Sequence, residues 1–209
     1  MSQLDLLSQG ESEYESLDQL FKKMKRMKDD PLADAGTNIV ISRGNPAAKL
    51  MIVGEAPGPQ ENIQGKPFVG RAGQLLDKVL QAAEFDPEKD VYITNSVFRM
   101  PPGEEGKTFR KPTDKEIEYY RPYVFEIIRL VDPLIILLTG NVACQSVLGK
   151  TGITSLRGKW TESNERWLMP IFHPSYLLRN PARDANSPKA LMWSDMQRVR
   201  AKYDELVGK

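Results

Sequence analysis

Short apolar runs alternate along this chain with longer stretches whose apolar positions recur at helical spacing. The runs at 50–53, 91–97, 134–138 and 167–172 predict four β-strands. The third run is apolar on both faces, which is typical of the middle of a parallel sheet. Apolar positions three and four residues apart predict helices over 17–27, 71–84, 113–131, 141–148 and 188–206. Because strands alternate with helices, the pattern predicts an α/β fold with a parallel sheet covered on both faces.

The length and charge of the chain narrow the classes of protein to which it can belong. At 209 residues it is long enough for one full core, and we expect a loose N-terminal tail over 1–14 and a single domain over 15–209. Its 29 Lys and Arg against 28 Asp and Glu leave a net charge of +1, so any surface for nucleic acid must come from local asymmetry. The chain has no apolar run that could span a bilayer and no signal peptide, so we expect an intracellular protein without a membrane partner.

Cysteine and histidine, the usual metal ligands, are scarce. The only cysteine, Cys144, excludes an internal disulfide and a cysteine-built metal site, and the only histidine, His173, excludes a histidine-rich one. We therefore expect no metal site. The sequence also lacks a Gly-x-Ser-x-Gly elbow, a Walker loop and a Gly-x-Gly-x-x-Gly after any strand, which argues against serine hydrolysis and nucleotide-triphosphate binding.

Polar loops follow three of the predicted strands, at 55–68, from Asn95 onward and at 173–181. Ligands of open α/β sheets bind at the carboxyl ends of the strands, where these loops meet. Gly54 and the glycines after it let the backbone approach a bound group closely. The alternative interpretation of the first loop is a tight strand–helix connection without chemistry, and that of His173 is a structural histidine.

Four motifs in these loops carry a resemblance to a known family. They read VGEAPG at 53–58, GKPFVGRAGQLL at 65–76, YITN at 92–95 and HPSYLLRNP at 173–181. In this order and spacing they closely resemble the family 4 uracil-DNA glycosylases, and the likeness extends from about Gly36 to Pro181. The resemblance implies a three-layer α/β/α sandwich around a central four-stranded parallel sheet.

The resemblance also implies roles for the residues of one pocket, into which the enzyme flips the base. Phe68 is expected to stack on uracil, and Asn95 to face the edge of uracil with a donor and an acceptor that cytosine does not match. His173 is expected to donate to uracil O2 as negative charge builds on the departing ring. A core phenylalanine and a strand-capping asparagine are the alternative interpretations of the first two residues.

The loop after the first strand supplies the other implied pocket residues. Glu55 is expected near the sugar, where it stabilises a cationic transition state or positions water, and Glu61 beside C5 of the base, where it disfavours thymine. Gly54 and Ala56 are expected to contact the substrate through the loop backbone. Ala56 stands where family 1 enzymes have a water-activating aspartate. Both carboxylates have the alternative interpretation of solvated loop residues.

The last motif is implied to contact DNA. Leu177 is expected to wedge into the space that the flipped base leaves, and Ser175 and Arg179, with Asn180, to bind flanking phosphates. A local basic face is expected to include further cations, with solvated surface residues as the alternative: Lys107, Arg110, Lys111, Arg157 and Lys159.

One departure from the family concerns its iron–sulfur cluster. Family 4 enzymes hold the cluster through four cysteines, and the matching positions here are Met27, Asp30, Phe98 and Tyr120. Because Cys144 alone cannot hold a cluster, we expect no cofactor. The three bulky replacements are expected to fill part of the vacated volume.

The function that these observations predict is a monofunctional DNA repair hydrolase that removes uracil and leaves an abasic site. Its expected partner is uracil-containing DNA, single- or double-stranded, and it is expected to be a monomer in the cytoplasm, associated with the nucleoid, or a virus-encoded intracellular protein. The alternatives are a catalytically weak or inactive accessory protein of replication that binds DNA with the same fold, and a glycosylase with broader specificity for deaminated bases.

Overall fold

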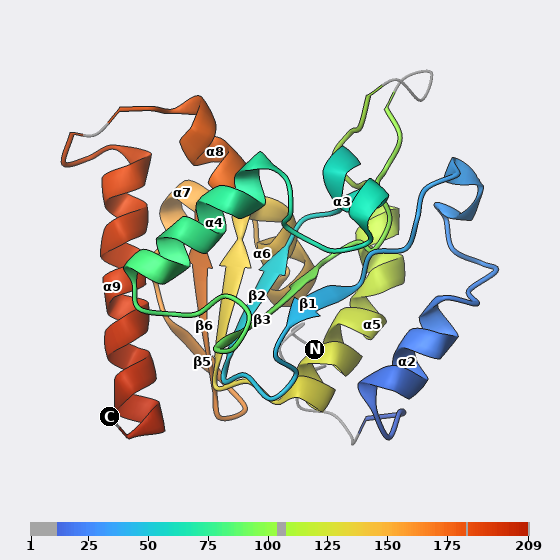
Figure 1. The fold of residues 1–209 in the computed structure, drawn as a ribbon, viewed down its shortest axis with the longest axis horizontal. Coiled ribbons are helices and arrows are strands. Elements are labelled where there is room, and N and C mark those ends of the chain that lie inside the picture. The colour runs from blue at the N-terminus through green and yellow to red at the C-terminus, as the bar shows by residue number, and fades with distance from the viewer. Residues whose placement is uncertain (1–11, 104–107, 183, 209) are drawn as a thin grey trace.

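A six-stranded sheet forms the centre of the protein, with strands in the order β1-β3-β2-β4-β6-β5 (Figure 1). The computed structural model describes residues 12–103, 108–182 and 184–208. The strands are β1 (Ser42–Gly44), β2 (Leu50–Gly54), β3 (Val91–Asn95), β4 (Ile135–Thr139), β5 (Thr161–Ser163) and β6 (Arg166–Ile171). The helices are α2 (Leu17–Met24), α3 (Pro59–Gln64), α4 (Arg71–Ala82), α5 (Asp114–Val131), α6 (Gly140–Leu148), α7 (Ile153–Leu156), α8 (Pro174–Arg179) and α9 (Pro188–Val207), with a 3₁₀ turn at Ala33–Ala35.

The four predicted strands are present as β2, β3, β4 and β6, and they pair in parallel. The sheet is larger than the predicted four-stranded one, because β1 pairs antiparallel with β3 and β5 pairs antiparallel with β6 at the two edges. Each edge strand has only three residues, and most of them are half-buried. Such short strands form through their pairing with a neighbour and leave little hydrophobic pattern in the sequence.

The long helices begin where the sequence predicts them. Ser16 caps α2 through the backbone N–H of Gln19, and Thr113 caps α5 in a capping box with Glu116. The short helices α3, α7 and α8 were not predicted, and 173–181, interpreted as a loop, contains α8. Prolines at 59 and 174 begin α3 and α8, since proline suits the first helical turn.

Alternate residues of each central strand face two separate cores, one on either side of the sheet. Met51 and Val53 of β2 pack with α2, α5 and α6, whereas Leu50 and Ile52 pack with α4, α8 and α9. Figure 1 shows the same arrangement, with helices covering both faces of the sheet. The expected three-layer α/β/α sandwich is therefore confirmed.

The end of the predicted loose tail is packed against α5. Ser12 and the backbone N–H of Glu13 both donate to the carboxylate of Glu126, and Tyr14 is partly buried against the core beneath it. The prediction of a loose tail is therefore wrong for 12–14, and 1–11 lies outside the described residues. Contact with a buried carboxylate of α5 holds these three residues in place.

The four positions matched to cluster cysteines lie in one region beside α5. Phe98 and Tyr120 are fully buried, with their rings in edge contact at 5.5 Å, and Met27 packs partly buried against the same core. Asp30 is 5% exposed and accepts a hydrogen bond from the Tyr120 hydroxyl. Its other oxygen lies 2.5 Å from Nε of Arg99. Rings and one buried ion pair thus occupy this region.

No helix in the described part of the chain is both long and apolar enough to cross a membrane.

Candidate active site

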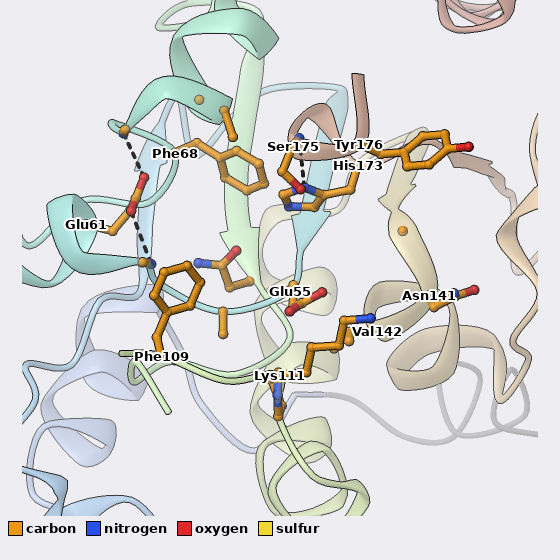
Figure 2. Close-up of a pocket in the computed structure, with 18 of the residues that line it drawn as sticks. Glu55, Glu61, Phe68, Phe109, Lys111, Asn141, Val142, His173, Ser175 and Tyr176 are labelled. Carbon is orange, nitrogen blue, oxygen red and sulfur yellow. Dashed lines mark hydrogen bonds between the residues drawn. The ribbon is translucent and has the colours of Figure 1, made fainter. Parts of the chain in front are cut away.

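The three polar loops predicted from the sequence meet in one cavity at the carboxyl ends of β2, β3 and β6. Glu55, Phe68, Asn95 and His173 all line it. Figure 2 shows Glu55, Phe68 and His173 around a common space. Parallel pairing places Gly54 of β2 level with Asn95 of β3, so both strands end at the same height. The sequence prediction that these side chains share one pocket agrees with this placement.

Asn95 presents an unused hydrogen-bond donor to the cavity. The residue is 1% exposed, and its amide nitrogen Nδ2 has no hydrogen-bond partner in the described part of the chain. An unsatisfied buried donor costs about 1–3 kcal/mol. A ligand that brings an acceptor into the cavity accounts for it.

The Phe68 ring is held close to Asn95 by two glycines. A Cβ atom on Gly54 would lie 2.4 Å from the Phe68 ring and 2.3 Å from Oδ1 of Asn95. A Cβ on Gly73, in the first turn of α4, would lie 1.8 Å from the Phe68 carbonyl oxygen. Phe68 itself has φ of 54°, an unfavourable conformation for a residue with a side chain. The surrounding contacts therefore fix the ring in a strained turn.

The Glu61 carboxylate is bound to the backbone of the loop that carries Phe68. It lines the cavity, but one carboxylate oxygen accepts from the backbone N–H of Gly58, and the other accepts from those of Val69 and Gly70 at 3.0 and 2.8 Å (Figure 2). These bonds join both ends of the loop that carries Phe68. We therefore interpret Glu61 as a positioning residue for Phe68, and its expected place beside C5 of the base stays a prediction.

The sequence analysis missed a second positioning residue, Arg43 on the edge strand β1. Its guanidinium donates to the carbonyl oxygens of Pro67 at 3.0 Å and Phe68 at 3.4 Å, and its side chain is 7% exposed. Asp77 on α4, at 2.5 Å, and Glu88 pair with its charge. Arg43 lies outside the four motifs and on a strand that was not predicted, so no sequence signal marked it.

His173 presents a neutral imidazole with a defined tautomer. The backbone N–H of Ser175 donates to Nδ1, and the Ser175 hydroxyl lies 2.8 Å from the same nitrogen. Because Nδ1 accepts, the proton of the neutral ring is on Nε2. Burial, together with the positive charge of Arg179, lowers the pKa of His173 to about 4. The ring lies 5.9 Å from that of Phe68.

Glu55 lies in the cavity with its backbone fixed, since its carbonyl oxygen accepts from the N–H of Val97 at 3.0 Å. Burial raises the pKa of its carboxyl group, whereas the positive charges of Lys111 and Arg179 lower it. The side chain is half-buried and approached by cations from two different elements. A carboxylate in this position can stabilise positive charge that develops on a bound ligand. Ala56 also lines the cavity.

The predicted wedge residue, Leu177, does not reach the surface. It is 1% exposed and packs in the core beneath α8, whereas Leu178 is 40% exposed. A helix begins at Pro174, so the rotation of that helix turns Leu177 inward. Ser175 and Arg179, predicted to bind phosphates, both line the cavity.

Some of the cations predicted to form a basic face are paired with carboxylates. Arg157 forms a bidentate pair with Asp195, and Arg110 pairs with Glu116 at 2.7 Å. Lys107 lies outside the described residues. Lys111 lines the cavity.

Comparison with known proteins identifies the family. Residues 41–197 match the family described as the Uracil DNA glycosylase superfamily. The chain belongs to this superfamily. It is 33% identical over 185 residues to the Type-4 uracil-DNA glycosylase of Thermotoga maritima, a match that covers 86% of this chain and 91% of that protein. Membership in the superfamily confirms the resemblance carried by the four motifs.

Two further relatives extend the comparison. The Type-4 uracil-DNA glycosylase of Archaeoglobus fulgidus is 35% identical over 177 residues, covering 80% of this chain and 85% of that protein. A DNA polymerase of Bacillus phage SP01 is 34% identical over 152 residues, covering 73% of this chain but only 16% of that longer protein.

The environment of His173 predicts an imidazole that stays neutral at pH 7. Since His173 is the only histidine, ¹⁵N-detected NMR of the labelled protein follows its ring alone. We expect a pKa near 4 with the proton on Nε2, and a return to about 6.5 in the urea-unfolded chain. Arg179→Gln removes a nearby cation and should raise this pKa. A folded-state pKa of 6 or above, or a proton on Nδ1, would contradict the assignment.

Proposed function

We propose that this protein removes uracil from DNA by hydrolysing its N-glycosidic bond, leaving an abasic site. The observation that carries the proposal is the buried Nδ2 of Asn95, which lies beside the Phe68 ring and has no hydrogen-bond partner among the described residues. Sequence identity of about a third to proteins named Type-4 uracil-DNA glycosylase supports it.

Recognition of the base follows from the donor that Asn95 offers. The uracil ring stacks on Phe68, and Nδ2 donates to O4 of uracil. Cytosine has an amino group at that place, which is a donor, so two donors would face each other in a buried site. A mismatch of this kind discriminates strongly because the polar groups remain unpaired.

Cleavage requires stabilisation of a departing uracil anion. The Nε2–H of His173 donates to O2 of the base, where negative charge grows as the bond breaks. A fixed donor aimed at developing charge stabilises the transition state more than the ground state. The neutral imidazole keeps Nε2 as a donor because Ser175 occupies Nδ1.

The sugar becomes positively charged as uracil leaves. The Glu55 carboxylate stabilises this cation and orients the water that adds to the anomeric carbon, and the proton of that water is released on product formation. Lys111 and Arg179 favour the ionised form of Glu55, since their charges oppose the effect of burial on its pKa.

A uracil-excision assay tests the proposal. The protein is incubated with single- and double-stranded oligonucleotides that contain uracil, thymine or hypoxanthine, and abasic sites are then cleaved with alkali. We expect cleavage of the uracil strands. Asn95→Ala and His173→Ala should each lower the single-turnover rate about 10²–10³-fold, because each removes one donor to the base.

Gln81→Ala is the matched control, since it removes an exposed amide from α4, and it should leave the rate unchanged. Thermal unfolding of all variants checks that they remain folded. Retained DNA binding without cleavage by the wild type would support the accessory protein instead. Near-normal rates in the Asn95 and His173 variants would refute their roles.

We also propose that the protein works without an iron–sulfur cluster. Clusters need thiolate ligands, and the four matching positions are occupied by Met27, Asp30, Phe98 and Tyr120. The Asp30 carboxylate is already bound by Arg99 and Tyr120. Cys144 is fully buried in α6, and burial raises the pKa of its thiol to about 12, so it resists forming a thiolate.

This proposal predicts two results. Protein purified without oxygen should contain far less than one iron per chain. Asp30→Ala should lower the free energy of unfolding in urea by about 3 kcal/mol, because it leaves the Arg99 charge and the Tyr120 hydroxyl unpaired. Asp29→Ala removes an exposed neighbour and should change it by less than about 0.5 kcal/mol. Stoichiometric iron would end the proposal, and equal stability of the two variants would contradict the structural role of the Asp30 contacts.

We further propose that the protein acts as a monomer on the DNA of a cell or of a virus inside one. Phe109 and Tyr176, two of the exposed large apolar side chains, line the pocket, where they face DNA rather than a second protomer. Sedimentation equilibrium should give a mass near 23.6 kDa at micromolar concentration. A mass near twice this value would contradict the monomer.

A further inference from the structure

One wall of the pocket comes from a segment that lies outside the four motifs, and the proposed mechanism uses only the charge of Lys111 in it. Phe109, Arg110, Lys111 and Pro112 all line the cavity, and we call residues 108–112 the loop wall. Figure 2 shows the Phe109 side chain directed toward the pocket from this wall, with Phe68 and His173 farther up the view.

Phe109 is an exposed aromatic at the mouth of the pocket. It is 58% exposed and belongs to neither hydrophobic core, in contrast to Phe68, which is 6% exposed. Exposure of a large ring is unfavourable in water. The two rings lie at different depths and are therefore placed for different partners. Phe68 is placed for a base inside the pocket, and Phe109 is placed for a group that remains at the mouth.

The backbone around Phe109 is held in place. Phe109 forms an antiparallel bridge with Pro102, and the flanking bonds run from Gly103 N–H to Thr108 O at 2.8 Å and from Arg110 N–H to Pro101 O at 3.1 Å. The guanidinium of Arg110 bonds both oxygens of Glu116, at 2.9 and 2.7 Å. The ring is therefore presented to solvent by an ordered support.

Lys111 adds a positive charge to the same wall. Its side chain is exposed and makes no hydrogen bond or ion pair with the part of the chain that the structure describes, whereas its neighbour Arg110 is paired. The charge is close enough to Glu55 to lower the pKa of that carboxyl group. Arg179 approaches the same carboxylate from α8. The two cations thus stand on two elements beside the position of the sugar.

We propose that the loop wall is a second DNA-binding element, in which Phe109 stacks on the base next to the flipped nucleotide and Lys111 binds the phosphate between them. This inference rests on the proposed uracil excision, since the flipped nucleotide fixes where the neighbour lies. Bases of a single strand are free to stack on an aromatic side chain, whereas those of a duplex are already stacked on each other. The wall therefore favours uracil in single-stranded DNA.

Binding of an uncleavable substrate tests the wall directly. The probes are a single strand and a duplex that contain 2′-fluoro-2′-deoxyuridine, with the affinity measured by fluorescence anisotropy across a range of salt concentrations. Phe109→Ala should weaken binding of the single strand about tenfold and of the duplex much less. Phe109→Trp should restore affinity, because it keeps an aromatic face, and Phe109→Leu should not.

Lys111→Ala should weaken binding of both probes and make the plot of log affinity against log salt shallower by about 0.7 for the single strand, as expected for one lost phosphate contact. Trp193→Ala and Lys25→Ala, which remove an exposed aromatic and an exposed cation from α9 and from the end of α2, are the controls and should change neither probe.

The outcomes separate this inference from the proposed function. Wild-type cleavage of uracil together with normal binding by the Phe109 and Lys111 variants overturns the loop wall alone. Binding losses in these variants without wild-type cleavage support the wall as a DNA contact and overturn the enzyme. If Phe109→Leu binds the single strand as tightly as Phe109→Trp does, stacking is overturned. If the wild type binds neither probe, both proposals are overturned.

Discussion

The site depends on the absence of a side chain at Gly54. The end of β2 passes so close to the Asn95 amide and the Phe68 ring that even one methyl group would overlap both. Parallel pairing with β3 sets the height of Gly54 against Asn95, and Glu61 and Arg43 hold the turn that brings Phe68 to the same place. Backbone geometry therefore fixes the distance between the surface on which a base stacks and the amide that reads its edge.

The parts of the fold with strong local patterns were predictable. Four apolar runs gave the central strands, and caps such as Thr113 marked where long helices begin. The edge strands were not predictable, because three-residue segments acquire their structure from a neighbour. The same limit applies to Arg43, whose importance arises only when β1 places its guanidinium beside the Phe68 turn.

The sequence predicted which residues form the site better than it predicted how their side chains are oriented. Phe68, Asn95, Glu55 and His173 meet as the motifs imply. Leu177 was assigned to the DNA contact through the resemblance of its motif, and a six-residue helix has too few turns to show in the sequence which face is buried. The role of Glu61 could not be derived either, since its three backbone partners come from both sides of an irregular loop.

The single thiol of the protein lies on the helix that continues the pocket. Cys144 is fully buried in α6, and Gly140 and Asn141 at the start of that helix line the cavity. A thiol-specific reagent can reach this sulfur only when α6 separates from the sheet. The rate of its alkylation therefore reports how often the layer behind the active site opens, and the measurement needs no engineered label.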